Sequence, residues 1–550
     1  MSIFFQYPKE VFVCSLIVNL PCVFWVGLSI RVGGINSPRP ASQRAAALVL
    51  TAAMLTTLTA PAFAGTWYIE DGDITISAGK TEGTNKVTQG TTTDEEDTNT
   101  TITNRDKDTP SSNTVTIKAE NENDKVEVKL EDVNIDASSR VNPSATTLND
   151  TSYAAVNVTG KGDTNIELDG DNELKSGRYR AGLEHNQTAD SEGNVTSGKL
   201  TIQDDKDNAG SLTATGGESA AGIGGGNANA GQVTITGGNI TATGGYGSAG
   251  IGGGYGQISP NPNAGDGDIT ISGGTIKAAG GTFGAGIGGG YIGDAHVTIT
   301  GDATVEEVQG GEGAAGIGSG AYASIGEVEI SGNAKIDNVT GGDYGAGIGG
   351  GAFSSPDKIG NGNVVIKDNA KIDNVQGGAY GAGIGGGIFG LSNVTIEGNT
   401  KVNATGGAGG AAIGGGAGAE NNSDNNGNQI TIKSNENGSP TINAVGGGTD
   451  EGEEIVIGGA GIGAGCESDA DADITLEGKV TIVAKAGEGN AAIGDMNGEQ
   501  VFTGLDGSIT RYDPEGNDIT LPTDPVPAVP SSSGGSSADA SVQELSLIHI

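Results

Sequence analysis

Residues 233–254 read VTITGGNITATGGYGSAGIGGG, three short segments separated by glycines. In the first segment Val233 and Ile235 alternate with threonines, which is the two-residue period of a β-strand. A glycine pair then provides a turn, and Ile240 begins a second strand with the same alternation. The third segment, AGIGGG, sets one large apolar residue, Ile251, among residues with almost no side chain. These three segments together form the unit from which the fold can be predicted.

The third segment recurs nine times along the chain as Ala-Gly/Ala-Ile-Gly. The intervals between successive isoleucines run from 28 to 49 residues. RAGLEH (residues 180–185) is a degenerate tenth copy around Leu183. Self-similarity of this kind is the signature of a solenoid, with insertions between its repeats. The isoleucines of the motif are Ile223, Ile251, Ile287, Ile317, Ile348, Ile384, Ile413, Ile462 and Ile493.

Three strands per repeat, joined by glycine turns, describe one coil of a parallel β-helix. The sequence therefore predicts an all-β fold, a right-handed parallel β-helix with three-strand coils of about 30 residues. A helical solenoid is excluded because no window shows an apolar stripe with a period of 3.6 residues. A propeller is disfavoured because its blades need about 40 residues and four strands each.

The glycines of the third segment have two interpretations. In DYGAGIGGGAFS (residues 343–354), we expect Ala346 and Ile348 to point into a narrow core and the alternating glycines to face outward. Glycine permits sharp corners and close approach of two backbones, which is a purely structural reason for this composition. A bare outer face repeated from coil to coil can also admit a polymer or a protein layer. The sequence leaves both interpretations open.

Aromatic residues stand four or five positions before or after the motif isoleucine, so the fold would align them in columns. Such columns can stabilise the solenoid by stacking on one another. Exposed rings can instead receive the apolar faces of sugars, and we list them as candidate ligand-binding residues. They are Tyr246, Phe283, Tyr344 and Tyr380 before the isoleucine, and Tyr255, Tyr291, Tyr322, Phe353 and Phe389 after it.

The chain carries 68 acidic and 28 basic residues, a formal net charge of −40. Such a field repels nucleic acids and anionic membranes, so we expect no nucleic-acid partner, although the charge also simply keeps a surface hydrated. Behind the leader only Cys466 remains, so a disulfide framework within the chain is excluded. The three histidines lie far apart and form no zinc motif with cysteine.

Several acidic segments offer oxygen atoms for calcium, although none has the full pattern of a known loop. CESDADAD (residues 466–473) spaces its aspartates by two, as at the start of a calcium loop, but isoleucine replaces the required glycine. Solvated loops are the structural alternative. Calcium is therefore a candidate cofactor, with Asp266, Asp268, Glu420, Asp424, Asp469, Asp471 and Asp473 as candidate ligands.

An enzymatic role is a minor alternative. Parallel β-helices include polysaccharide lyases and hydrolases, so the fold itself permits catalysis. No arginine occurs between residues 181 and 510 to serve as the base of a lyase, and no facing carboxylate pair of a hydrolase can be selected. Nucleophile-elbow and phosphate-loop motifs are absent from the sequence. We therefore expect no catalysis.

The N-terminal region predicts export. Residues 39–67 combine a basic start, an apolar stretch and the small-x-small site Ala62-Phe63-Ala64, so we expect a secretory signal peptide within a leader of residues 1–64, cleaved after Ala64. The apolar segment at residues 11–30 is either an additional membrane anchor or lies upstream of the true start site. The protein is thus expected outside the cell, secreted or at the cell surface.

We expect three further regions. Residues 65–150 would form an N-terminal cap and irregular early coils, and residues 151–512 the glycine-rich β-helix. Residues 513–550, rich in proline, serine and glycine, read as a linker at which the sequence is truncated. Attachment to a membrane or cell wall would then come only from a leader anchor or a missing C-terminal segment.

VTITGGNITATGG followed by AGIGGG, together with TNIELDGDNELKSG (residues 164–177), resembles carbohydrate-binding domain-containing β-helix proteins that Gram-positive and gut bacteria export. The resemblance covers about residues 114–510 and is strongest from 164 to 415. It implies a surface protein that binds acidic or plant-type polysaccharides, with calcium as a candidate aid, and it transfers no catalytic motif.

The sequence thus predicts a secreted or cell-surface, non-catalytic protein that binds an extracellular polysaccharide of cell-wall or plant type. A surface adhesin or structural stalk that binds a protein partner is the alternative. A polysaccharide lyase or hydrolase is a minor one.

Overall fold

A computed structural model describes residues 65–147, 151–204, 209–257, 264–352, 360–420, 427–449 and 457–526. The leader, the apolar segment 11–30, Phe353, Asp424 and residues 527–550 lie outside these ranges. The only helical element in the described ranges is one 3-10 turn, η1 (Ile69–Asp71). Among these residues, no helix has the length and apolar character needed to cross a membrane.

The described strands form three sheets, which we call the first, second and third sheets after the order of their strands within a coil. The first sheet has 13 strands among the described residues. They are β1 (Thr66–Tyr68), β5 (Thr100–Thr103), β7 (Lys125–Glu131), β10 (Asp163–Asp169), β13 (Leu200–Gln203), β16 (Gly231–Ile235), β19 (Gly267–Ile271), β22 (Ala295–Ile299), β25 (Ile325–Ile330), β28 (Asn361–Ile366), β31 (Ser392–Glu397), β34 (Asn428–Lys433) and β37 (Ala472–Glu477).

The second sheet has 12 strands within the same described ranges. They are β8 (Asn134–Asp136), β11 (Asp171–Lys175), β14 (Ser211–Thr215), β17 (Asn239–Thr243), β20 (Thr275–Ala279), β23 (Thr304–Gln309), β26 (Lys335–Thr340), β29 (Lys371–Gln376), β32 (Lys401–Thr405), β35 (Thr441–Val445), β38 (Lys479–Lys485) and β41 (Asp506–Tyr512).

The third sheet has 16 strands in the part of the chain that the structure describes, and most are two residues long. They are β4 (Thr92–Asp97), β3 (Asn85–Gln89), β2 (Ile74–Ala78), β6 (Val115–Ala119), β9 (Val156–Gly160), β12 (Leu183–His185), β15 (Ile223–Gly224), β18 (Ile251–Gly252), β21 (Ile287–Gly288), β24 (Ile317–Gly318), β27 (Ile348–Gly349), β30 (Ile384–Gly385), β33 (Ile413–Gly414), β36 (Ile462–Gly463), β39 (Ile493–Asp495) and β40 (Gly498–Glu499).

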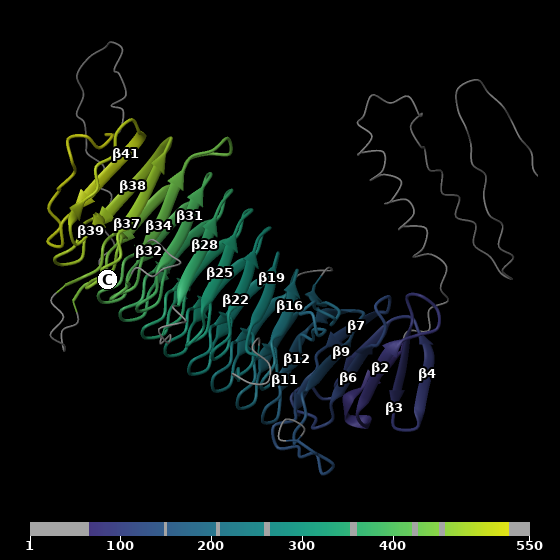
Figure 1. Cartoon of the computed structure of the whole chain (residues 1–550). Helices are drawn as coiled ribbons and strands as arrows, with labels where there is room; N and C mark the ends of the chain where they lie inside the picture. The colour runs from purple at the N-terminus through teal and green to yellow at the C-terminus, as the bar shows by residue number, and fades with distance from the viewer. Residues whose placement is uncertain are drawn as a thin grey trace, which may run out of the picture. The chain divides into compact units, whose positions relative to one another are not determined.

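Apart from antiparallel pairs at the two ends of the third sheet, each described strand pairs in parallel with its equivalents in the neighbouring coils. Figure 1 shows β16, β19, β22, β25 and β28 of the first sheet lying side by side in this way. In the third sheet the motif isoleucines pair directly, for example Ile317 with Ile348 and Ile348 with Ile384. The predicted all-β fold, a parallel β-helix of three-strand coils, is confirmed.

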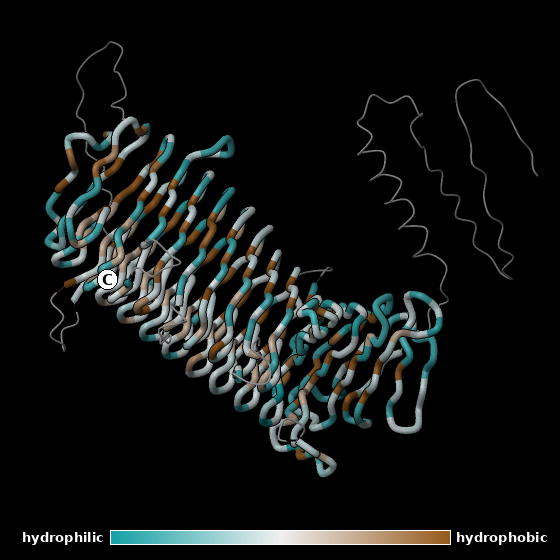
Figure 2. Tube along the Cα trace, in the orientation of Figure 1, coloured by the Kyte–Doolittle hydropathy of each residue, from teal (hydrophilic) through white to brown (hydrophobic). Residues whose placement is uncertain are grey.

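The core is a single column of stacked apolar residues enclosed by the three sheets. Ile348 shares one buried cluster with Val328 and Ile330 of the first sheet and with Ile336 and Val339 of the second. The outward residues between them are polar, as the alternation of hydrophobic and hydrophilic positions along the strands in Figure 2 illustrates. Because the same positions recur in every coil, each coil buries its apolar side chains against the next one.

The third strand of each glycine-motif coil is short and lies in a tight turn centred on the motif isoleucine. The N–H two residues before the isoleucine donates to the carbonyl two residues after it, as from Ala346 to Gly350 at 2.9 Å. The glycine directly after the isoleucine has a positive φ in every motif copy, for example +139° at Gly318. A Cβ at Gly318 would also lie 2.0 Å from the carbonyl oxygen of Gly349 in the next coil. Both the backbone angle and the contact require glycine here.

The bare outer face considered from the sequence is not open. Gly345, Gly347 and Gly349 are buried, as are Ala346 and Ile348. A Cβ on Gly347 would lie 2.6 Å from a methyl group of Val375. The glycine strip is therefore covered by neighbouring coils, and its role is close packing rather than reception of a polymer.

The N-terminal end is closed by strands that depart from the parallel pattern. β3 pairs antiparallel with β2 and with β4 at the edge of the third sheet. Beneath this hairpin, the indole N–H of Trp67 donates to Asp97 at 2.8 Å. The acidic outer strand β4 discourages addition of another strand at this edge.

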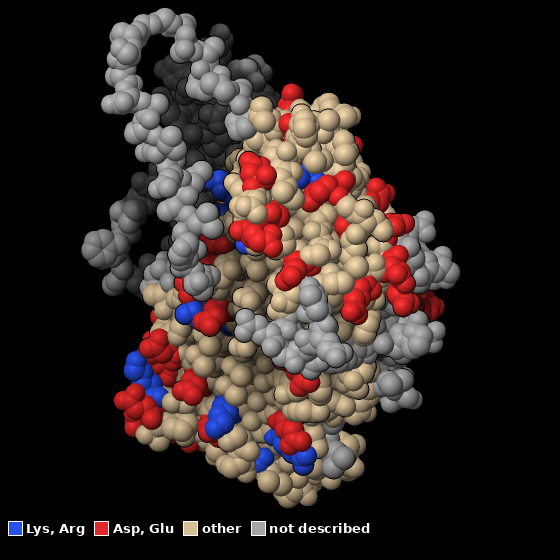
Figure 3. Space-filling model, turned by 90° about the vertical axis from the view of Figure 1, so that its left-hand side faces the viewer, with Lys and Arg blue, Asp and Glu red and all other residues tan. Residues whose placement is uncertain are grey.

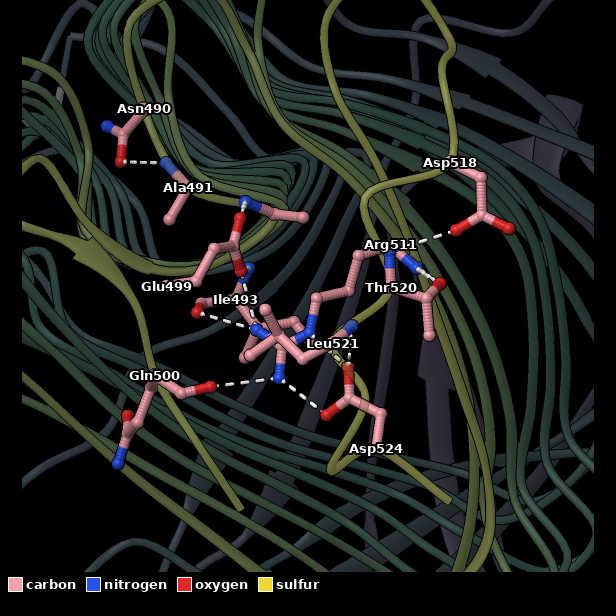
Figure 4. A network of polar contacts seen from close by, with 11 residues as sticks. Asn490, Ala491, Ile493, Glu499, Gln500, Arg511, Asp518, Thr520, Leu521 and Asp524 are labelled. Atoms are coloured by element: carbon pink, nitrogen blue, oxygen red, sulfur yellow. Dashed lines mark hydrogen bonds and ion pairs between the residues drawn. The ribbon is translucent and has the colours of Figure 1, made fainter. Parts of the chain in front are cut away.

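The C-terminal end is closed by a buried ion cluster (Figure 4). In the last coil, the N–H groups of Ala492 and Ile493 lack a following coil and donate instead to the carboxylate of Glu499, at 2.6 and 3.1 Å. Arg511 is fully buried and donates to Glu499 and, at 2.8 and 3.0 Å, to Asp524. Residues 513–526, assigned to a linker from the sequence, thus return to the last coil and place Asp524 there.

We expect Gly318→Ala to lower the free energy of unfolding by about 2–4 kcal/mol, because it combines a forbidden backbone angle with a clash against the next coil. Gly448→Ala is the matched control, since a Cβ at Gly448 meets nothing within 4 Å and its φ is not positive. Urea unfolding followed by far-UV circular dichroism measures both. An equal loss in the two variants would contradict the proposed role of the motif glycine.

We expect Arg511→Leu to destabilise the last coils by about 3–5 kcal/mol, because the buried carboxylate of Asp524 and the half-buried carboxylate of Glu499 lose their partner. Neighbouring coils stabilise one another only locally in a solenoid, so amide hydrogen exchange should accelerate in β38, β39 and β41 but not in β16 or β19. Lys479→Leu, which removes an exposed cation from β38, is the control and should leave exchange unchanged. Uniform acceleration along all coils would rule out a local end cap.

Candidate functional site

Two corner positions flank the motif isoleucine in successive coils, and both have left-handed backbone angles. In most described coils the position four residues before the isoleucine, or before Leu183, has φ between +66° and +76°. In most of them the position five residues after it has φ between +50° and +66°. The residues at the first corner are Tyr179, Ser219, Gly247, Phe283, Gly313, Tyr344, Tyr380, Gly409 and Gly489, and those at the second are Ala228, Ile292, Tyr322, Phe389, Gly418 and Glu467.

These angles follow from hydrogen bonding between coils. The N–H of Tyr344 donates to the carbonyl of Ala379 in the next coil at 2.7 Å, and that of Tyr380 to Ala408 at 2.8 Å. At the second corner, the N–H of Phe389 donates to Ala417 at 2.8 Å. The left-handed backbone angle orients the N–H group of each corner residue toward the next coil. The hydrogen bonds between coils therefore continue through the corners.

Five of the aromatic residues named as ligand candidates from the sequence occupy these corners, although glycine would suit the backbone better. Left-handed angles cost an L-residue about 1–2 kcal/mol, and large side chains rarely adopt them. Other coils place glycine at the same corners, as at Gly313 and Gly409. Aromatic side chains at strained positions point to a use of the rings themselves. The five residues are Phe283, Tyr322, Tyr344, Tyr380 and Phe389.

The predicted columns exist, and we call the eight described rings the aromatic band. Its leading column, before the isoleucines, consists of Tyr246, Phe283, Tyr344 and Tyr380, and its trailing column of Tyr255, Tyr291, Tyr322 and Phe389. The two columns touch, because the ring centroids of Tyr246 and Tyr255 lie 6.2 Å apart and those of Phe283 and Tyr291 lie 5.9 Å apart. Phe353 would extend the trailing column but lies outside the described residues.

The rings differ in what they present to solvent. Tyr255 lies almost parallel to Tyr246 and to Tyr291, at interplanar angles of 21° and 13°, so both of its faces are occupied. Tyr344 and Tyr380 stack at 5.7 Å and 8°. The most exposed rings are Phe389 at 52%, Tyr246 at 51% and Tyr322 at 38%, and the others are half-buried. The band therefore offers three exposed rings to solvent, and its other five rings are only partly accessible.

A further aromatic residue at the first corner position, Tyr179, was not among the candidates predicted from the sequence. Tyr179 has φ +68° and stands four residues before Leu183, the centre of the degenerate motif copy. The guanidinium of Arg178 lies 4.6 Å from its ring centroid and pairs with Glu218 at 2.8 Å. The spacing to Leu183 was a signal that could have identified this position.

The candidate calcium ligands do not converge. The carboxylate of Asp266 accepts the N–H of Asp294 at 2.9 Å, and so satisfies backbone of the next coil. Asp268 points outward from β19, with the amide of Gln232 at 3.4 Å. Glu420 is exposed in a different loop, and Asp424 lies outside the described residues.

The remaining candidates, Asp469, Asp471 and Asp473, are exposed side chains at the start of β37. Among the described residues, no three histidine, cysteine or acidic side chains lie close enough to hold a metal ion. Acidic side chains are instead spread over the surface, as Figure 3 shows for one end of the stack, where red residues outnumber the few blue ones. The donor set on the described coils therefore does not fit a calcium site.

Cys466 is not a reactive group in the folded protein. Its side chain is buried beside Gly409, where an added Cβ would lie 2.7 Å from the sulfur. Burial raises the pKa of its thiol to about 11, so almost no thiolate forms near neutral pH. This cysteine packs a corner and offers no nucleophile.

Comparison with known proteins supports the repeat and nothing finer. Residues 208–227, 233–255 and 269–291 match a family model described as a beta helix repeat. No curated protein and no solved structure matches the chain. The matched segments contain the aromatic residues from Tyr246 to Tyr291, but the model carries no statement about a ligand.

We expect Tyr344→Gly to be more stable than Tyr344→Ala by about 0.5–1 kcal/mol, because only glycine adopts the left-handed corner without cost. Tyr246 is the matched control, since it belongs to the same column but has no positive φ. There the order should reverse, with alanine the more stable replacement. Chemical unfolding of the four variants gives both differences, and the same order at both sites would contradict the strained-corner account.

Proposed function

We propose that this protein is a secreted or cell-surface, non-catalytic β-helix that binds an extended polysaccharide of cell-wall or plant type along its aromatic band. The observation that carries the proposal is the placement of aromatic residues at corners where glycine would suit the backbone. The rings of Tyr322 and Phe389 are kept at such a cost and are 38% and 52% exposed, and the unstrained Tyr246 adds a third exposed ring at 51%. These exposed rings serve contact with a ligand.

The dimensions of the band suit a chain-like ligand. Tyr246, Tyr255, Phe283, Tyr291 and Tyr322 form one continuous ring cluster over three successive coils. Coils repeat at about 4.8 Å, so the cluster extends over about 10 Å and reaches more than one sugar unit. Exposed rings supply apolar contact and the tyrosine hydroxyl groups supply hydrogen bonds, which are the two kinds of contact that sugars use.

A stalk or adhesin that binds a protein partner is the second candidate. The face-to-face stacks favour it, because Tyr255 is covered on both faces and the Tyr344–Tyr380 pair covers one face of each ring. Such stacking stabilises the solenoid whether or not a ligand binds. Under this alternative the band contributes stability, and binding resides elsewhere.

The proposed binding does not involve calcium, because the described acidic residues do not converge on a position that could hold a metal ion. The chain's own rings and hydroxyl groups hold the ligand. A chelator is the direct test of calcium-assisted binding.

The test is binding of the purified protein to xylan, galactan, cellulose oligomers and polygalacturonate, with calcium and with chelator. We expect saturable binding to at least one glycan. Tyr246→Ala and Phe389→Gly should each weaken it by about five- to twentyfold, which corresponds to about 1–2 kcal/mol. Glycine is chosen at Phe389 because the corner there has φ +61°.

Tyr512→Ala, which removes a half-buried tyrosine outside the band, is the matched control and should leave affinity unchanged. Tyr255→Ala should reduce stability more than affinity, because both faces of that ring contact tyrosines. Absence of binding to every glycan in both conditions would contradict the proposal and favour the stalk. A loss of binding with chelator would bring the acidic loops into the site.

A further inference from the structure

The third sheet changes character before the first complete glycine motif. Its later strands are two-residue tips without outward side chains, whereas β6 and β9 are five residues long. Their outward residues Thr116 and Asn157 are direct neighbours in the register. In these early coils the outer face of the third sheet thus presents polar side chains at Thr116 and Asn157.

A hollow of about 210 Å³ lies over this face. Thr116 and Asn157 line it, and so do Asn142, Ser152 and Tyr153. Most of its lining is hydroxyl or amide groups, which can donate and accept hydrogen bonds. Tyr153 and Ala154 provide a small apolar part. This mixture suits one polyhydroxylated molecule better than an apolar one.

Arg180 forms part of the lining and has an unused donor. Its Nη2 atom pairs with the buried carboxylate of Glu184 at 2.9 Å. Its Nε atom is buried and has no hydrogen-bond partner among the described residues. A buried donor left unpaired costs free energy, which an acceptor in the hollow would recover after a small movement of the side chain. A carboxylate is the acceptor that a guanidinium binds best.

A second arginine, Arg140, contacts two residues that line the hollow. Arg140 lies 4.2 Å from the ring centroid of Tyr153 and donates to Asp73 and, at 3.4 Å, to Thr114 of the hollow. Four of the five arginines among the described residues, Arg105, Arg140, Arg178 and Arg180, lie between residues 105 and 180. The early coils thus concentrate guanidinium groups in an otherwise acidic chain.

From this arrangement we propose that the hollow binds a sugar acid, with its carboxylate at Arg180 and its hydroxyl groups at Thr116 and Asn157. The site is separate from the aromatic band, so either proposal can fail without the other. Two sources share this chemistry, a free sugar acid and the end of an acidic polysaccharide. No chemical step is required, because the ligand is only held.

The test is isothermal titration of the full secreted chain with galacturonate, galactose, acetate and trigalacturonate. We expect galacturonate to bind at least about tenfold more tightly than galactose, which lacks the carboxylate, and than acetate, which lacks the hydroxyl groups. Comparable or tighter binding of trigalacturonate would identify a chain end as the ligand, and its exclusion would identify a free sugar acid.

Arg180→Lys keeps the positive charge but removes the Nε donor, and Asn157→Ala leaves the pair of Arg180 and Glu184 intact. Each should weaken galacturonate binding by about tenfold. Arg178→Gln is the matched control, because it removes a neighbouring arginine that does not line the hollow, and it should not change affinity. No saturable galacturonate binding, equal binding of acetate, or equal loss in the Arg178 variant would overturn the proposal.

Discussion

The close contact between the motif glycines of successive coils is the constraint on which the rest of the structure depends. At Gly318 the backbone of the next coil occupies the place that a side chain would take, 2.0 Å from an added Cβ. The chain can therefore turn within two residues around Ile317, whose side chain fills the core at that corner. A third strand this short keeps the coil narrow, so alanine, valine and isoleucine suffice to fill its interior.

The same close stacking explains the unusual aromatic positions. When coils pack this tightly, every backbone N–H must find a carbonyl in its own coil or in a neighbouring one, also at the corners. Tyr344 and Phe389 meet this requirement with left-handed angles. Their side chains then stand on the outside of the corner, in line with those of neighbouring coils. The aromatic band is thus a consequence of backbone hydrogen bonding combined with a choice of side chain that the backbone does not favour.

At each end of the described coils, the hydrogen bonds between coils end, and the two ends satisfy their backbone groups in different ways. At the C-terminal end the carboxylate of Glu499 takes the place of the missing coil, and Arg511 compensates its charge in the interior. At the N-terminal end an antiparallel hairpin covers the edge. In the early coils the third strand is longer, and this leaves room for polar side chains and for the hollow beside Arg180.

The coil could be predicted from the amino-acid pattern alone. The alternation in VTIT, the glycine turns and the recurrence of Ala-Gly-Ile-Gly predicted three parallel sheets and the buried isoleucine column, because these features are local and periodic. The spacing of Tyr246, Phe283 and Tyr344 from their isoleucines likewise predicted columns. Four further features depend on contacts between coils and became evident only in the structure. The glycine face is covered, Tyr255 is enclosed by its neighbours, the candidate calcium ligands stay apart, and Arg180 faces a hollow over strands that belong to earlier coils. Such contacts are set by how one coil lies on the next, which a pattern within one repeat does not specify.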